Sequence, residues 1–138
     1  MKETVSVKNT GLRGVTVADT KISFIDGVQG ILIYRGYRIE ELAEKSTYLE
    51  TAYLLLKGYL PSDQELSAFS REVFEQSSLP GYVIECLRKI PGNSDPMDVL
   101  QAGAPLLGMD DPDLNVESRE ANERMAARLI GRLPTLVA

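Results

Sequence analysis

The spacing of apolar residues changes along the chain, from the alternation expected of strands to the three- and four-residue spacing expected of helices. In the first quarter, residues 21–25 and 30–34 are rich in β-branched and aromatic side chains, which favour strands. Asp26-Gly27 stands between them and is a strong hairpin signal. With a further short strand at residues 15–17, the sequence predicts a small β-meander.

The rest of the chain carries the helical spacing, and capping residues and prolines divide it into segments. Ser62 followed three residues later by Glu65 is a capping box. Gly58 suits a helix C-terminus, and Pro105 falls in the last turn of a predicted helix, where it would kink or thin that turn. The predicted helices cover about residues 38–46, 49–57, 62–74, 80–91, 96–107 and 116–133, with an acidic loop at 109–115.

The predicted fold class is therefore mainly α. We expect one multi-helical region over residues 1–138, strand-rich at 1–36 and helical at 37–138, with no internal repeat or linker. In the last helix, the residues expected to face inward are Ala121, Met125, Leu129 and Ile130.

The chain contains no histidine and a single cysteine, Cys86. These counts exclude a Ser-His-Asp or Cys-His arrangement, a histidine general base and a histidine-containing zinc site within this polypeptide. They also exclude an internal disulfide, and a cytoplasmic location is expected. Because Cys86 lies among Val83, Ile84 and Leu87, we predict a buried, inert thiol.

The charge pattern argues against nucleic acid and membrane partners. The net charge is −5, with 15 basic against 20 acidic residues, and no segment has the basic excess that binds a phosphate backbone. Apolar runs are far shorter than the ~20 residues that span a bilayer. No nucleic acid and no membrane are therefore expected as partners.

Two charged clusters are candidate binding sites. Arg124, Arg128 and Arg132 recur every four residues and could grip an anion, but we favour a solvated, partly salt-bridged face, since Glu120 precedes Arg124 by four residues. The acidic residues of the 109–115 loop could hold a hard cation, but they lack the glycine and the distal glutamate of a calcium loop. We therefore predict a solvated turn at Asp110, Asp111 and Asp113.

Three further arginines and three glycines lie in the strand-rich part. Bidentate arginine often holds a carboxylate or phosphate, but we favour hydrogen bonds from these arginines to turn carbonyls and pairing with Asp26, Glu40 or Glu41. The glycines match no phosphate-loop spacing and are expected to serve turns. The residues are Arg13, Arg35 and Arg38, and Gly27, Gly30 and Gly36. The sequence thus assigns no catalytic, cofactor-binding or metal-binding residue.

Three small residues in succession, Ala102, Gly103 and Ala104, fall inside the predicted helix at 96–107. Glycine inside a helix costs about 1 kcal/mol relative to alanine, and close helix-to-helix packing would compensate. The partner helix could belong to the same chain or to another subunit, and the residues alone do not choose between the two.

Several motifs occur in the order found in the amino-terminal region of the citrate synthase family, which this chain resembles over nearly its whole length. They are Gly11-Leu12-Arg13-Gly14-Val15, residues 20–27, residues 30–43, residues 51–61, Pro96-Met97-Asp98-Val99-Leu100 and residues 133–138. One departure is Asp95, at a place where members commonly have histidine.

The resemblance implies an acyltransferase of the tricarboxylic acid cycle. In that family an aspartate base and histidine donors enolise acetyl-CoA, the enol attacks oxaloacetate or a related 2-oxoacid, and the thioester is then hydrolysed. Acetyl-CoA is a substrate, and no further cofactor is implied. Family enzymes are roughly three times as long, and their catalytic residues lie beyond the stretch matched here.

The resulting prediction is an amino-terminal part of a citrate-synthase-type enzyme, inactive alone. It would supply scaffold and would pair with a missing carboxy-terminal half or partner subunit. The resemblance also implies a homo-oligomer through helices at about 96–107 and 116–133, with residues 102–104 at the interface. Alternatives are a non-catalytic binding or regulatory module that pairs with a full-length relative, part of a 2-methylcitrate synthase or citryl-CoA-cleaving relative, and an enzyme of unrelated chemistry.

Overall fold

The computed structural model describes residues 18–138, so the predicted strand at 15–17 and the candidate Arg13 lie outside the described residues. The described part begins with three antiparallel strands, β1 (Ser23–Asp26), β2 (Ile31–Tyr34) and β3 (Tyr37–Arg38), in the order β1-β2-β3. The predicted β-meander is confirmed at β1 and β2, which fall on the predicted strands 21–25 and 30–34. Because β3 extends to Arg38, the helical part begins two residues later than the predicted boundary.

Two different turns join the strands. Between β1 and β2, the Asp26 carboxylate accepts hydrogen bonds from the backbone N–H groups of Val28 and Gln29, each at 3.0 Å. Between β2 and β3, Arg35 and Gly36 both have positive φ, 49° and 94°. Positive φ at both central residues is the geometry of a type I′ hairpin, and this turn creates the third strand that the sequence pattern missed.

Six helices follow in the described chain. They are α1 (Ile39–Lys45), α2 (Tyr48–Lys57), α3 (Asp63–Glu75), α4 (Gly81–Leu87), α5 (Pro96–Leu106) and α6 (Arg119–Val137). The mainly α class and the order of the predicted helices are confirmed. Predicted caps explain the agreement: Ser62 and Glu65 form the capping box of α3, and Gly58 ends α2 in the left-handed conformation.

Two helices differ from the prediction at their ends. The fourth was expected to continue until Pro91-Gly92, but α4 ends at Leu87. The Arg88 N–H still bonds four residues back, whereas the N–H groups of Lys89 and Ile90 bond three residues back in the tighter 3₁₀ manner. The last was expected at 116–133, but α6 starts only after Ser118, whose hydroxyl accepts from the N–H of Ala121.

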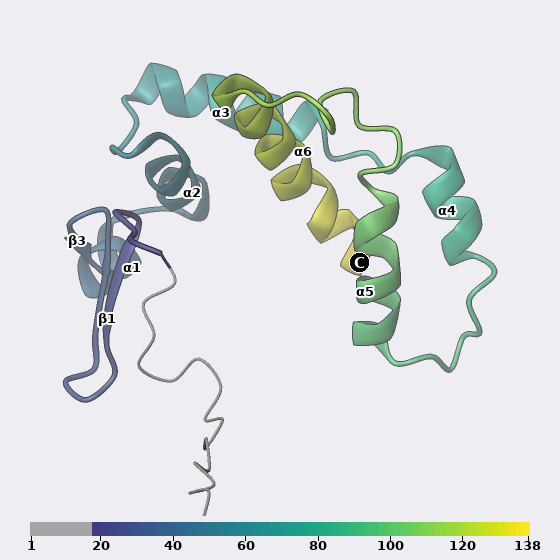
Figure 1. The fold of residues 1–138 in the computed structure, drawn as a ribbon, viewed down its shortest axis with the longest axis horizontal. Coiled ribbons are helices and arrows are strands. Elements are labelled where there is room, and N and C mark those ends of the chain that lie inside the picture. Colours follow the sequence, from purple (N-terminus) through teal and green to yellow (C-terminus); the bar gives the residue numbers. More distant parts are fainter. Residues whose placement is uncertain (1–17) are drawn as a thin grey trace, which may run out of the picture.

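The elements form an open arch rather than a closed ball (Figure 1). The meander and α1 lie at one end, α4 and α5 at the other, and α3 and α6 cross between them. α6 contributes to two separate cores. Ala127 joins Tyr53, Phe69 and Val73, whereas Leu136 joins Val83 and Leu107. This helix therefore ties the two ends of the arch together.

Two glycines allow helices to approach closely in this arch. A Cβ on Gly131 of α6 would collide with the carbonyl oxygen of Val73 and lie 3.3 Å from the Ser77 nitrogen. A Cβ on Gly103 of α5 would lie 2.8 Å from a methyl carbon of Leu136. Gly103 is therefore explained by packing within one chain, which is one of the two alternatives that its sequence context leaves open. Ala102 is exposed.

The inward face of α6 differs in part from the prediction. Ala121 is fully buried, and Met125 and Ile130 are half-buried, but Leu129 is 43% exposed and was wrongly expected inside. Ala127 and Gly131 are the buried residues instead. The contact with α3 selects small side chains, because the two backbones lie close together.

Within residues 18–138, no helix combines the length and the apolar character needed to cross a lipid bilayer.

Candidate functional site

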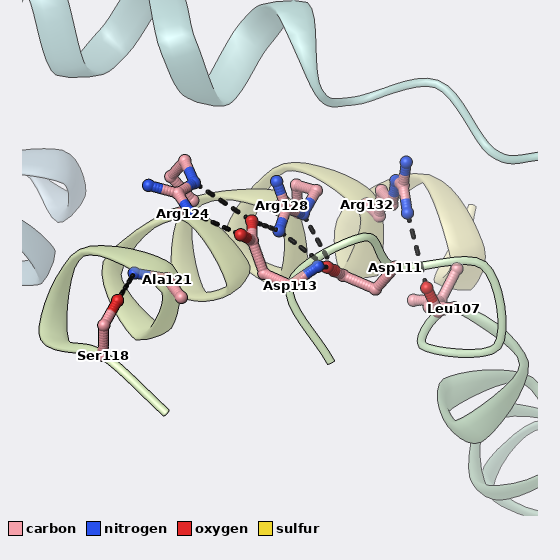
Figure 2. Close-up of polar contacts among 8 residues, drawn as sticks. All are labelled: Leu107, Asp111, Asp113, Ser118, Ala121, Arg124, Arg128 and Arg132. Carbon is pink, nitrogen blue, oxygen red and sulfur yellow. Dashed lines mark hydrogen bonds and ion pairs between the residues drawn. The ribbon is translucent and has the colours of Figure 1, made fainter. Parts of the chain in front are cut away.

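Arginine and aspartate side chains gather between α6 and the loop that precedes it. Arg124, Arg128 and Arg132 project from one face of α6 toward the loop between α5 and α6 (Figure 2). Residues four apart share a helix face, so their guanidinium groups form a row. We call Arg124, Arg128, Asp111 and Asp113 the Arg–Asp cluster.

The two aspartates are paired with both arginines. Arg128 donates Nε to Asp111 Oδ2 at 2.8 Å and Nη2 to Asp111 Oδ1 at 2.7 Å, and it also bonds Asp113. Arg124 holds Asp113 in a second bidentate pair, with Nε 3.0 Å from Oδ2. Bidentate arginine–carboxylate pairs are among the strongest polar contacts in proteins.

The loop itself prepares the two carboxylates for this pairing. The N–H of Asp113 donates to Asp111 Oδ1 at 2.9 Å, and the N–H of Leu114 donates to the Asp111 carbonyl at 3.2 Å. The Asp111, Asp113 and Arg128 side chains are only 8%, 10% and 13% exposed. The expected solvated turn is therefore wrong at Asp111 and Asp113, because they are the buried partners of the arginine row.

Each carboxylate is stabilised in its charged form. Hydrogen bonds from Arg124 and then Arg128 hold the pKa of Asp113 well below its usual range. Burial by itself would raise the pKa of Asp111, but the hydrogen bonds from Arg128 and the Asp113 N–H outweigh burial, and the net pKa is lowered. The cluster is thus permanently ionised near neutral pH, without a group that could act as a general base there.

Arg132 completes the row but is paired differently. Its Nη1 donates to the Leu107 carbonyl at 3.4 Å, and its Nε is buried without a hydrogen-bond partner among the described residues. Tyr82 lies nearby and donates to the Leu106 carbonyl at 2.5 Å and to Asp110 at 3.2 Å. Together these contacts fix the start of the α5–α6 loop. The arginines thus bind this loop, and none of these hydrogen bonds involves Glu120, the partner expected for Arg124.

The other candidate arginines in the described residues agree with the prediction in part. Arg38 pairs with Glu40, its Nε lying 3.3 Å from Glu40 Oε2, as expected. Arg35 donates Nη2 to the Leu55 carbonyl at 2.9 Å. This carbonyl lies within helix α2, so the expected turn carbonyl is wrong for Arg35. Gly30 and Gly36 lie in turns with positive φ, at 68° and 94°.

The structure corrects the prediction for Cys86. The sequence context predicted a buried thiol, but Cys86 is exposed. In α4 the buried side chain is Val83, and Leu87, one turn further, also packs in that core, whereas no described segment covers the side of α4 that carries Cys86. In the described part of the chain, no three His, Cys, Asp or Glu side chains gather where they could hold a metal ion.

A second polar cluster was missed by the sequence reasoning. Tyr59 donates to Glu65 Oε1 at 2.8 Å and Tyr53 donates to the same oxygen at 3.2 Å, while Glu65 Oε2 accepts from the Ser62 N–H at 2.9 Å. The capping box indicated Ser62, but nothing in the local pattern indicated that two tyrosines converge on the same carboxylate. Hydrogen bonds from Ser62 and Tyr59 lower the pKa of Glu65 to about 2.

This lowered pKa makes the stability of the chain depend on pH. Because the folded-state pKa of Glu65 lies below the usual 4.5, its contribution is complete above pH 4.5 and is lost as the pH falls toward 2. We predict that Glu65→Gln, which can keep the capping box, shows a flatter decline of unfolding free energy between pH 4.5 and 2 than the parent chain. Urea unfolding at several pH values measures this, and parallel curves would contradict it.

The described residues form a mainly helical fold in which the Arg–Asp cluster bonds the α5–α6 loop to α6. Comparisons with known proteins identify its class: the family described as "Citrate synthase, C-terminal domain" matches residues 11–138. The chain therefore belongs to the citrate synthase family.

Individual relatives support the family and show that the match is partial. The chain is 39% identical to the glyoxysomal citrate synthase of Cucurbita maxima over 86% of its own length and 25% of the relative's. It is 38% identical to the citrate/2-methylcitrate synthase of Bacillus subtilis, over 93% and 34%. The chain thus spans about a third or less of the curated relatives that it matches.

Solved structures share the fold. Citrate synthase from Pyrobaculum aerophilum matches with a TM-score of 0.81 and 35% identity, over 98% of this chain and 39% of that one. Citrate synthase from Thermoplasma acidophilum, in a ternary complex with carboxymethyl coenzyme A and oxaloacetate, matches with a TM-score of 0.82 and 28% identity, over 96% of this chain and 36% of that one.

Proposed function

We propose that this chain is the amino-terminal part of a citrate-synthase-type enzyme that condenses acetyl-CoA with oxaloacetate to give citrate and CoA. In this proposal it supplies scaffold and dimer-interface helices, and the catalytic residues belong to another part. The family match over residues 11–138 in a chain without histidine carries the proposal. The family's enolisation uses histidine donors, so this chain needs a second part for the chemistry.

The amount of exposed surface supports a scaffold that is covered by further polypeptide. The chain exposes 10764 Å², whereas a compact monomer of this size exposes about 7,100 Å². The residues outside the described range account for at most about 2,700 Å² of this area, so an excess on the order of 1,000–2,000 Å² remains. Stable protein interfaces bury about 800 Å² on each partner.

The dimer role is assigned to α5 and α6. Three large apolar side chains on these helices are exposed: Met97 at 67%, Leu129 at 43% and Val137 at 69%. Exposed apolar side chains of this kind suit an interface. Gly103 is already used within the chain, so Leu129 is a better position than Gly103 at which to test the oligomeric state.

The acyl substrate is a separate question within this proposal. Relatives at 38% identity include the Bacillus subtilis citrate/2-methylcitrate synthase and a 2-methylcitrate synthase of Mycobacterium tuberculosis. Part of a 2-methylcitrate synthase is therefore the second candidate. The proposal also includes a cytoplasmic location. It includes no nucleic acid partner, in line with the acidic charge balance of the chain.

We predict that the purified chain alone releases no free CoA from acetyl-CoA and oxaloacetate, since it supplies no histidine donor. A thiol-reactive dye measures the release. Co-expression with the carboxy-terminal remainder should give a complex that releases CoA. Turnover by the chain alone would overturn the proposal, and a partner that is already active and is merely altered by the chain would favour a regulatory module.

A further inference from the structure

An uncharged trough runs between α2, α3 and α6. Two adjoining hollows, of about 380 and 370 Å³, share Tyr48 and Ile130 in their linings. The first continues past Phe74 and Pro134, and the second continues along Leu55 toward the meander. Of the described residues that line them, none is Asp, Glu, Lys or Arg. We call this feature the α2–α3–α6 trough.

The rim of the trough is apolar and exposed. Phe74, in the last turn of α3, is 78% exposed, and Tyr48, the first residue of α2, is 71% exposed. Each ring stands beside half-buried apolar groups such as Leu49 and Ile130. Large aromatic side chains at the edge of an apolar hollow are typical anchors of protein interfaces.

We propose that the α2–α3–α6 trough seats an apolar helical segment of the polypeptide that completes the enzyme; this inference rests on the proposed function. The solved Thermoplasma acidophilum relative has the same fold over 96% of this chain, yet the match covers only 36% of that relative. Nearly two thirds of such a protein is therefore available to cover this fold. A cover of that kind would account for the excess of exposed surface over that of a compact monomer.

The geometry favours a helix from that part over a second copy of this chain. The trough lies where α6 approaches α3 so closely that Gly131 has no room for a side chain. The flanking helices already direct their apolar faces inward, with Phe69 and Val73 in one core together with Ala127. In the proposed function a second copy is assigned to the exposed Met97, Leu129 and Val137, and none of these lines the trough. The trough is thus left for a segment of the missing part, and an additional helix fits an elongated uncharged groove.

The test uses the full chain and the Bacillus subtilis citrate/2-methylcitrate synthase, divided into the piece that this chain matches and the larger remainder. The split is chosen so that these two pieces reassemble into active enzyme. The larger piece is the probe. We expect it to bind the parent chain and to bind Phe74→Lys about ten-fold more weakly or worse, because an interface anchor is lost. Lysine in the last turn suits the helix dipole, and Phe74 is exposed, so the variant should match the parent in circular dichroism and urea midpoint. Isothermal titration calorimetry measures the affinity.

Val28→Lys is the matched control, since Val28 is 98% exposed and lies in the β1–β2 turn, outside the trough. It should bind the probe like the parent chain. If the probe binds the parent and Phe74→Lys equally well, the trough assignment is wrong while the proposed function stands. If the probe fails to bind the parent chain, the inference is wrong, whereas the proposed function is tested separately by CoA release on co-expression with the carboxy-terminal remainder. Self-association of the parent chain in light scattering that Phe74→Lys abolishes would assign the trough to a second copy and overturn the inference.

Discussion

Replacing Gly131 by alanine is expected to lower the free energy of unfolding by about 2–3 kcal/mol, the usual range for forcing an extra carbon into a tightly packed contact. The added Cβ would collide with the Val73 carbonyl oxygen and approach the backbone of Gln76 and Ser77. Backbone atoms cannot rotate away as a side chain can, so α3 and α6 must separate. The loss should outweigh the gain of up to about 1 kcal/mol that alanine brings to a helix interior. Urea unfolding followed by circular dichroism measures the change.

Gly81→Ala is the matched control for this prediction. Gly81 is the first residue of α4, and a Cβ there would meet nothing within 4 Å, so its stability should equal or slightly exceed that of the parent chain. The unfolding free energy of Gly103→Ala should lie between those of Gly131→Ala and Gly81→Ala, because its Cβ would approach a methyl of the flexible Leu136 side chain. Equal stabilities for Gly131→Ala and Gly81→Ala would show that α3 and α6 do not pack as closely as described.

The same contact shows how far local sequence patterns reach. A glycine inside a helix signals close packing, and that signal identified Gly103 correctly as a packing position. The same signal was present at Gly131, within the predicted last helix, but the partner is the backbone near Val73, more than fifty residues away. Helix ends at Gly58 and Ser62 were predictable because a cap involves neighbours in sequence.

The Arg–Asp cluster was only half predictable for a similar reason. The four-residue spacing places Arg124 and Arg128 on one face of α6, and the acidic loop was visible as a run of charges. The pairing itself depends on how the α5–α6 loop folds back along α6, which the local pattern does not specify (Figure 2). The available signal was the opposite charge of the acidic loop and of the arginine row on α6. Glu120 is closer to Arg124 in sequence, and it is therefore the partner that the local spacing predicts for Arg124.

The second large effect is expected for Arg128→Met, which should destabilise the chain by about 3 kcal/mol at pH 7, as breaking one partner of a buried pair does. Arg128 is 13% exposed and bonds both Asp111 and Asp113. Methionine fills similar space, but it leaves two nearby carboxylates in a poorly solvated site without their shared cation. Urea unfolding at pH 7 measures the loss. Arg124→Met should cost less, because Arg124 is 49% exposed and Asp113 would retain Arg128.

The pH dependence separates the lost charge from lost packing. In the parent chain the pKa values of Asp111 and Asp113 are lowered, so their contribution is complete above the unfolded pKa near 4 and declines as the pH falls. In Arg128→Met the two carboxylates repel each other, and their pKa values rise relative to the parent chain. Protonation as the pH falls therefore removes this repulsion in the variant. The difference in unfolding free energy between the parent chain and Arg128→Met should therefore narrow from pH 7 to pH 3. Adding Asp111→Asn to Arg128→Met should restore part of the lost stability at pH 7. A gap that stays constant with pH would assign the effect to packing alone.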